Sequence, residues 1–146
     1  MKLKRKIALL FASISLFSLG VGESINATDD LIKIYQGDFV DGKSTGKGIY
    51  TWANGDKYVG DWVNGNRTGK GTFNWVSGNK YVGDFLDNMP NGKGILTFPN
   101  GYKYEGEFVD DKRSGFAIVT LPNGDKYEGD FLNDIASGKG TLTFIN

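Results

Sequence analysis

One type of residue that could do chemistry recurs at a fixed spacing in this chain: a carboxylate stands at every 23rd position. The members of this acidic column are Asp38, Asp61, Asp84, Glu107 and Asp130. Such a column could bind cations, face a basic partner, or supply a glycosidase with its two carboxyl groups, which lie about 5–10 Å apart. We favour a solvated face that blocks unwanted sheet stacking, because the carboxylates should lie about two strand spacings apart, too far to share one ion.

The rest of the composition removes most catalytic chemistry. The chain has no cysteine and no histidine. A thiolate nucleophile, a zinc–thiolate site and the commonest general base are therefore excluded. We expect no catalytic residue, cofactor or metal. A carboxylate-based enzyme, or a binder, acting on cell-surface polysaccharide remains the alternative hypothesis.

The acidic column belongs to a repeat with a period of 23 residues. The copies of this repeat start at Tyr35, Tyr58, Tyr81, Tyr104 and Tyr127. Each copy has two short segments in which aromatic and β-branched residues alternate with polar ones, which is typical of strands. Glycine recurs too often for a helix. A fixed period of this length predicts a repeat architecture, here a stack of hairpins.

The turn residues and the aromatic residues predict how each hairpin pairs. We expect a six-residue loop from Asn64 to Gly69 inside the hairpin and a turn at Asn54-Gly55 between hairpins. The odd period requires one connection of even length and one of odd length. We expect Tyr58 to pair with Trp75, Gly60 with Phe73, and Trp62 with Gly71, so that large rings lie beside glycine or other rings.

The aromatic columns could form a stacking platform for sugars or single-stranded nucleic acid, but we favour a core on one face of the sheet. Phe116 is the exception. It stands where the other copies have lysine, at Lys47, Lys70, Lys93 and Lys139. It is the ring that we expect to be available to a ligand, the alternative being a tolerated change on the surface.

The pattern Tyr-x-Gly-x-Phe/Trp, followed by Gly-x-x-x-Gly-x-Gly and a closing Asn-Gly, resembles the MORN (membrane occupation and recognition nexus) repeat. The resemblance covers Tyr35 to Asn146 in five copies. It implies an all-β fold with one β-hairpin per repeat, stacked into an elongated, twisted, single-layer antiparallel sheet of about ten strands. It also implies a role as an interaction module, with membrane or phosphoinositide association as an alternative.

The N-terminus predicts export. Residues 1–27 combine a basic start, Lys2 to Lys6, with an apolar run over residues 7–22 and a polar end at Ala27. This order is typical of a secretory signal peptide, which we expect to be helical. The alternative is an uncleaved anchor formed by residues 7–22, although about 20 apolar residues are needed to cross a bilayer. Residues 28–34 are then a lead-in to the first repeat.

The charge of the remaining chain limits its partners. Residues 28–146 carry 13 basic and 16 acidic side chains, a net charge of −3. Such a chain has no electrostatic attraction for nucleic acid or anionic lipid, so we expect membrane contact only through an uncleaved N-terminus. The predicted function is a non-catalytic, periplasmic or secreted binding or scaffolding module for a protein or envelope partner. The last strand-like segment, Lys139 to Phe144, predicts end-to-end association of copies.

Overall fold

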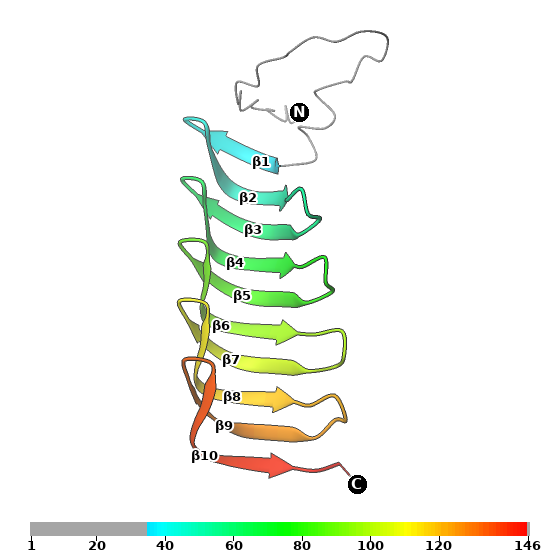
Figure 1. The fold of residues 1–146 in the computed structure, drawn as a ribbon. Coiled ribbons are helices and arrows are strands. Elements are labelled where there is room, and N and C mark those ends of the chain that lie inside the picture. The colour runs from blue at the N-terminus through cyan, green and yellow to red at the C-terminus, as the bar shows by residue number, and fades with distance from the viewer. Residues whose placement is uncertain (1–34, 146) are drawn as a thin grey trace, which may run out of the picture.

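The computed structural model describes residues 35–145, in which every regular element is a strand. The predicted signal segment, anchor and lead-in lie outside the described residues. Ten strands form one open sheet in sequence order, with every neighbouring pair antiparallel (Figure 1). They are β1 (Tyr35–Val40), β2 (Lys43–Thr51), β3 (Lys57–Val63), β4 (Asn66–Asn74), β5 (Lys80–Leu86), β6 (Met89–Thr97), β7 (Lys103–Val109), β8 (Lys112–Thr120), β9 (Lys126–Leu132) and β10 (Ile135–Thr143). The predicted fold class is confirmed.

The connections alternate between two and five residues, as the odd period requires. The predicted six-residue loop is wrong, because Asn64 and Gly65 alone connect β3 to β4 and the next residues are already in the strand. Both turn residues have positive φ, 51° and 86°, as a tight hairpin turn needs. Asn54-Gly55 lies in the five-residue connection between β2 and β3, where the Gly55 N–H donates to the Trp52 carbonyl at 2.9 Å.

The strand register differs from the prediction by two residues. Tyr58 pairs with Phe73, and Gly60 pairs with Gly71, not Phe73. Trp62 lies opposite Arg67, because β4 contains two more residues than β3 at this point of the ladder. This bulge brings the strands back into register with the two-residue turn. Pairing by ring size alone could not detect it.

Paired glycines allow a ring to lie directly on the backbone. A Cβ atom built on Gly71 would lie 2.4 Å from Cε2 of Tyr58, and one built on Gly60 would lie 2.4 Å from the hydroxyl oxygen of Tyr58. Tyr58 is fully buried, and its hydroxyl donates to the carbonyl of Asp61 at 3.1 Å. Burial raises the pKa of this phenol to about 12. The expectation that rings lie over bare backbone is therefore confirmed, with different partners.

The core is a continuous row of rings on one face of the sheet. Each central tyrosine meets the ring of the following hairpin edge-on, with centroids 5.0 Å apart for Tyr58 and Phe85 and for Tyr81 and Phe108. The buried members of this ring face are Tyr58, Trp62, Phe73, Tyr81, Phe85, Tyr104, Phe108, Ala117, Val119 and Phe131. Edge-to-face pairs add about 0.5–1.5 kcal/mol each beyond burial, so the rings join one hairpin to the next.

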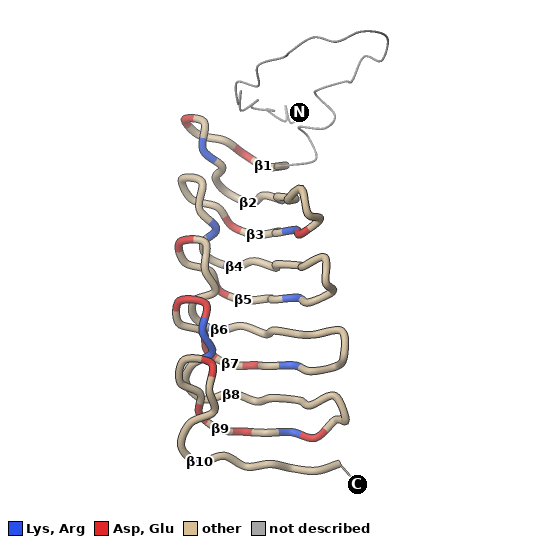
Figure 2. The backbone as a smooth tube through the Cα atoms, viewed as in Figure 1, with Lys and Arg blue, Asp and Glu red and all other residues tan. Residues whose placement is uncertain are grey.

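Hydrogen bonds at the tight turns also join successive hairpins. The second turn residue donates its N–H to a carbonyl of the preceding hairpin, for example Gly65 to Ser44 at 2.9 Å and Asn88 to Arg67 at 3.0 Å. The same bond recurs between Asp134 and Arg113 at 3.0 Å. Charged residues recur at equivalent backbone positions in successive hairpins (Figure 2). The repeat therefore fixes the position of every side chain on both faces.

Candidate functional site

The face opposite the rings carries an exposed row of β-branched side chains. In register across the strands, Val59 faces Thr72, Thr72 faces Val82, and Val82 faces Ile95. Val59, Val82 and Ile95 are 40%, 41% and 37% exposed. They alternate along their strands with residues of the ring face, Tyr58, Tyr81 and Leu96, so the same alternation that builds the core also places an apolar strip on the other face.

A row of charged side chains runs beside this apolar row. In the first two hairpins, the lysine in the bulge faces the acidic residue of the next hairpin: Lys47 with Asp61, and Lys70 with Asp84. Lys47 donates a hydrogen bond to Asp61 Oδ1, and Lys70 Nζ lies 2.5 Å from Asp84 Oδ1. The other oxygen of Asp61 accepts the backbone N–H of Lys70 at 3.1 Å, so one carboxylate joins two hairpins.

The ion pair with Lys47 lowers the pKa of one of these carboxylates, and the paired lysines remain accessible. The hydrogen bond from Lys47 holds the pKa of the Asp61 carboxyl below its usual range. A general acid needs the opposite shift, which makes this carboxylate unsuited to that role. The paired lysine side chains remain 81% and 73% exposed. Each ammonium has three N–H donors, so it can bind a further acceptor.

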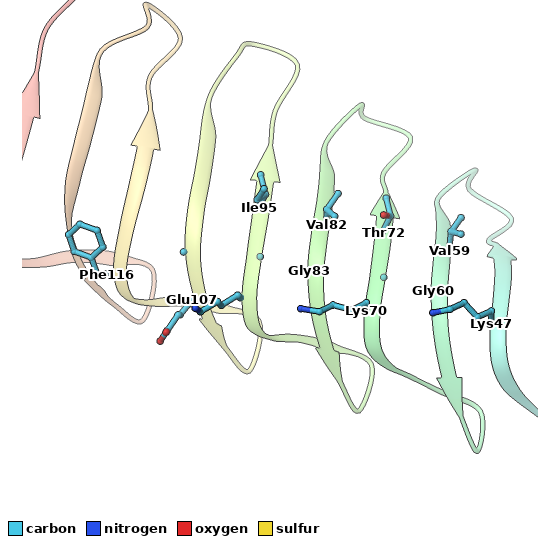
Figure 3. A pocket seen from close by; sticks show the side chains of 14 residues that line it. Lys47, Val59, Gly60, Lys70, Thr72, Val82, Gly83, Ile95, Glu107 and Phe116 are labelled. Carbon is cyan, nitrogen blue, oxygen red and sulfur yellow. The ribbon is translucent and has the colours of Figure 1, made fainter.

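The two rows enclose an open groove of about 820 Å³ that runs across the strands (Figure 3). The apolar row forms one side, the lysines form the other, and glycine backbone, including Gly60, Gly71 and Gly83, forms the floor. Figure 3 shows the labelled aliphatic side chains and the labelled lysines as two rows at different heights along the strands. A groove with an apolar wall and a row of donors fits an elongated ligand.

Phe116 lines the last part of the groove, on β8. It occupies the bulge position of its hairpin, where Lys70 and Lys93 stand in earlier hairpins, and it faces Asp130 in register. The ring is 60% exposed. In this hairpin an aromatic ring therefore replaces the lysine that faces the carboxylate in earlier hairpins.

The structure brings only some of the predicted site residues to the groove. Phe116 and Glu107 line it, whereas Asp61 and Asp84 lie beside it as the partners of lysines. Asp38 and Asp130 occupy the equivalent places in the first and fifth hairpins and do not line it. The acidic column is therefore spread along the sheet and is not gathered in one pocket. No group of three or more His, Cys, Asp or Glu side chains within residues 35–145 is arranged to hold a metal ion.

The groove itself was not predicted from the sequence. Val59, Val82 and Ile95 were not candidates, although their alternation with Tyr58, Tyr81 and Leu96 places them on the opposite face. The lysines were considered only as the residues that occupy the position of Phe116 in the other repeats. The missing information was the bulge, because it decides which lysine lies beside which carboxylate. Within residues 35–145 there is no helix with the length and hydropathy of a membrane span.

An open, single-layer sheet with one hairpin per repeat defines a β-repeat protein without a second layer over either face of its sheet. The family model described as MORN repeat matches residues 35–57, 58–80, 81–101, 104–126 and 127–146. The chain therefore belongs to the MORN repeat family.

Comparison with other proteins adds little to this assignment. No curated protein matches the chain. One solved structure found to be similar is the SAS-4 (dCPAP) TCP domain in complex with a proline-rich motif of Ana2 (dSTIL) of Drosophila melanogaster. It shares 14% identity, the match covers 80% of this chain and 73% of that one, and the TM-score is 0.34. A likeness this low carries no argument about function.

Proposed function

We propose that this chain is an exported, non-catalytic binding module, which uses the groove face to hold a protein or envelope partner. The observation that carries the proposal is the contrast between the two faces of the sheet. The rings bury one another on one face, whereas the other face exposes an apolar row, a lysine row and the groove between them. An accessible apolar surface bordered by polar groups is typical of an interaction site.

Export is the second part of the proposal, and it is supported by the order of basic, apolar and polar residues in 1–27. We expect removal of residues 1–27, leaving a periplasmic or secreted protein of residues 28–146. N-terminal sequencing of protein recovered from the native host would show a start at Thr28. A mature protein that retains residues 7–22 and sediments with membranes would instead support the anchor.

Site-specific photo-crosslinking tests the binding surface in the native host. A photoreactive residue at Val82 lies in the groove, whereas one at Val109, which is 52% exposed and does not line the groove, is the matched control. We expect a discrete adduct from position 82 that is absent from position 109, and the purified partner should bind the wild-type protein. Adducts of equal yield from both positions would contradict a groove-specific site.

A second candidate interaction, end-to-end association, is favoured by the last described strand. In residues 35–145, β10 pairs with β9 alone and is exposed along its whole length. Among the ring contacts within residues 35–145, Tyr127 meets Phe131 of its own hairpin, at 6.0 Å, whereas Tyr104 also meets a ring of the next hairpin, at 5.3 Å. A second copy would supply such a ring from Phe39 and pair its β1 with β10.

Light scattering tests this association. We expect the mass of mature protein to rise with concentration, and Ile135→Lys, at a position that is 71% exposed on β10, to reduce that rise. Deletion of Thr141 to Asn146 should have the same effect. A monomer at every concentration, unchanged by either variant, would contradict end-to-end association.

A further inference from the structure

The spacing of the hairpins constrains the shape of any ligand that repeats along the groove. Adjacent strands lie about 4.8 Å apart, so equivalent side chains of successive hairpins recur about every 9.6 Å. A polyproline II helix rises about 3.1 Å per residue with three residues per turn, and therefore repeats about every 9.3 Å. The two periods differ by about 1 Å over three turns, which the side chains of lysine and valine can absorb.

Other extended ligands do not match this spacing. A β-strand places side chains on one face about every 6.7 Å, which drifts out of register with the hairpins after one repeat. A strand also needs a free sheet edge for its backbone hydrogen bonds, and the groove lies on the face, across the strands from β2 to β8. An acidic polymer is disfavoured because Lys47 and Lys70 already have carboxylate partners, Asp61 and Asp84.

The polar groups of the groove complement the backbone of a polyproline II helix. Such a helix makes no internal hydrogen bonds, so its carbonyl oxygens carry unsatisfied partial negative charge. Lys47, Lys70 and Lys93 present one ammonium per hairpin along one side of the groove. The carboxylates beside Lys47 and Lys70 hold these donors in place, while most of each lysine remains accessible. One lysine donor per turn matches one carbonyl per turn.

Phe116 resolves an ambiguity that a perfect repeat would create. A periodic ligand on a periodic groove could slide by one hairpin, about 9.6 Å, without losing contacts. At β8 the lysine is replaced by an exposed ring. A flat ring can pack against a proline, and in the register from β2 to β8 the last turn of the segment covers this ring, whereas a shift by one hairpin toward β1 leaves it uncovered. Phe116 therefore makes one register of the ligand distinct from the others.

We propose that the groove binds a proline-rich segment in the polyproline II conformation. The segment lies across the strands from β2 to β8, a length of about 29 Å, or about nine residues. The apolar residues of the segment contact the apolar row, in which Val59 and Val82 lie one hairpin apart and Ile95 lies on the strand beside Val82. Carbonyl groups accept hydrogen bonds from the lysines, and a proline at one end covers Phe116. This inference names the chemistry of the partner in the proposed function and rests on it.

Fluorescence anisotropy with a synthetic peptide tests the proposal. The probe is a labelled peptide of three Pro-Pro-Val triplets, and the control replaces every proline by alanine. We expect the proline probe to bind roughly tenfold more tightly than the control, because it is already ordered in the bound conformation. Val82→Glu should weaken binding roughly tenfold by placing an unpaired charge against the apolar row, whereas Val109→Glu should not change it.

Paramagnetic NMR tests the role of Phe116. A spin label on the proline probe should broaden amide signals in one region of wild-type protein, at a fixed distance from Phe116. In Phe116→Lys the broadening should spread over several hairpins, because the regular lysine row removes the distinct register. Equal spreading in both proteins would overturn the role of the ring.

The outcomes separate this proposal from the proposed function. Equal binding of the proline and alanine peptides, or no binding of either at millimolar concentration, would overturn the proposal. If position 82 still crosslinks a partner in the host, the groove remains a binding site for a different chemistry. If neither the peptide nor a host partner uses the groove, the proposed function fails as well.

Discussion

The two faces of this sheet use neighbouring residues for opposite purposes. Tyr81 and Val82 are consecutive in β5, yet Tyr81 is 1% exposed and Val82 is 41% exposed. Tyr81 contacts rings of its own and of the following hairpin at 5.1 and 5.0 Å, whereas Val82 lines an open groove. A single layer has no second sheet to cover either face, so its stability must come from one face covering itself. The other face is then available for recognition.

Truncation of adjacent residues should give the largest difference between the faces. Tyr81→Ala removes a buried ring and should lower the free energy of unfolding by about 3–5 kcal/mol. Val82→Ala removes methyl groups that are already in contact with water and should lower it by less than about 1 kcal/mol. Urea denaturation of both variants, followed by circular dichroism, measures the two values. Similar losses would show that both faces contribute equally to stability.

The glycines that form the floor of the groove should not tolerate a side chain, because a side chain there would point toward the rings on the opposite face. In Gly71→Val the new side chain would overlap the Tyr58 ring, because even a Cβ atom would lie 2.4 Å from it. We expect a loss of about 3 kcal/mol in the same assay. The fourth hairpin carries Ala117 at the equivalent position, buried at 1% exposure, so a single methyl group can be accommodated there. Ala117→Gly is therefore the control, with an expected loss of about 1 kcal/mol or less.

The hairpin architecture was predictable because it depends on local signals that repeat. The recurrence of tyrosine and glycine, the positions of turn residues, and the alternation of apolar and polar residues all predict the same stack of strands. The register was not predictable from these signals. The bulge adds residues such as Gly69 and Lys70 to one strand only, and a pairing that matches Tyr58 with Trp75 satisfies the same preference for rings beside small residues.

The groove was less predictable than the core for the same physical reason. Whether Lys47 lies beside Asp61 depends on the register between hairpins, which no local pattern specifies. Phe116 was identifiable because a departure from a repeat is visible without coordinates. Val82 was not identifiable, because a half-exposed valine in a strand is common. Its role becomes visible only when the structure shows the other residues of its row beside it.

A cation also stabilises the ring face, and its replacement should have an intermediate effect. The Arg67 guanidinium lies 5.2 Å from the centroid of Phe73 and 5.6 Å from that of Tyr58, and its Nη2 donates to the Asn88 carbonyl at 2.6 Å. Burial lowers the pKa of this group. Arg67→Lys keeps the charge but loses the planar contact with the rings.

We expect Arg67→Lys to lower the free energy of unfolding by about 1–2 kcal/mol. The groove-face control is Lys70→Ala. Its side chain is 73% exposed and forms a surface ion pair, so the expected loss is below about 0.5 kcal/mol. Thermal unfolding of the two variants under identical conditions makes the comparison. A larger loss from Lys70→Ala would reverse the assignment of the structural cation to the ring face.

The smallest expected effects are two pH dependences of opposite sign. Burial raises the pKa of the Asp111 carboxyl, and repulsion from Asp134 adds to the shift. At the equivalent turn position, Asn88 accepts the backbone N–H of Arg67 at 2.8 Å, but Asp111 faces Pro90, which has no N–H to donate. The contribution of Asp111 to stability is thus fully present below about pH 4 and is lost as the pH rises through the raised pKa. Asp111→Asn should therefore be more stable than wild type at pH 7, and the difference should vanish in acid.

Asp61 should behave in the opposite way, because the hydrogen bond from Lys47 depresses its pKa in the folded state. Its contribution is present above about pH 4 and is lost as the pH falls through the depressed pKa. Asp61→Asn should be slightly less stable than wild type at pH 7, by less than about 1 kcal/mol for a surface pair, with the difference vanishing in acid. Asp41→Asn, in an exposed turn, is the control. Melting temperatures at closely spaced pH values would show the two opposite trends. Parallel trends for Asp61→Asn and Asp111→Asn would contradict the distinction between a groove-face carboxylate paired with a lysine and a turn carboxylate that faces a proline without an N–H donor.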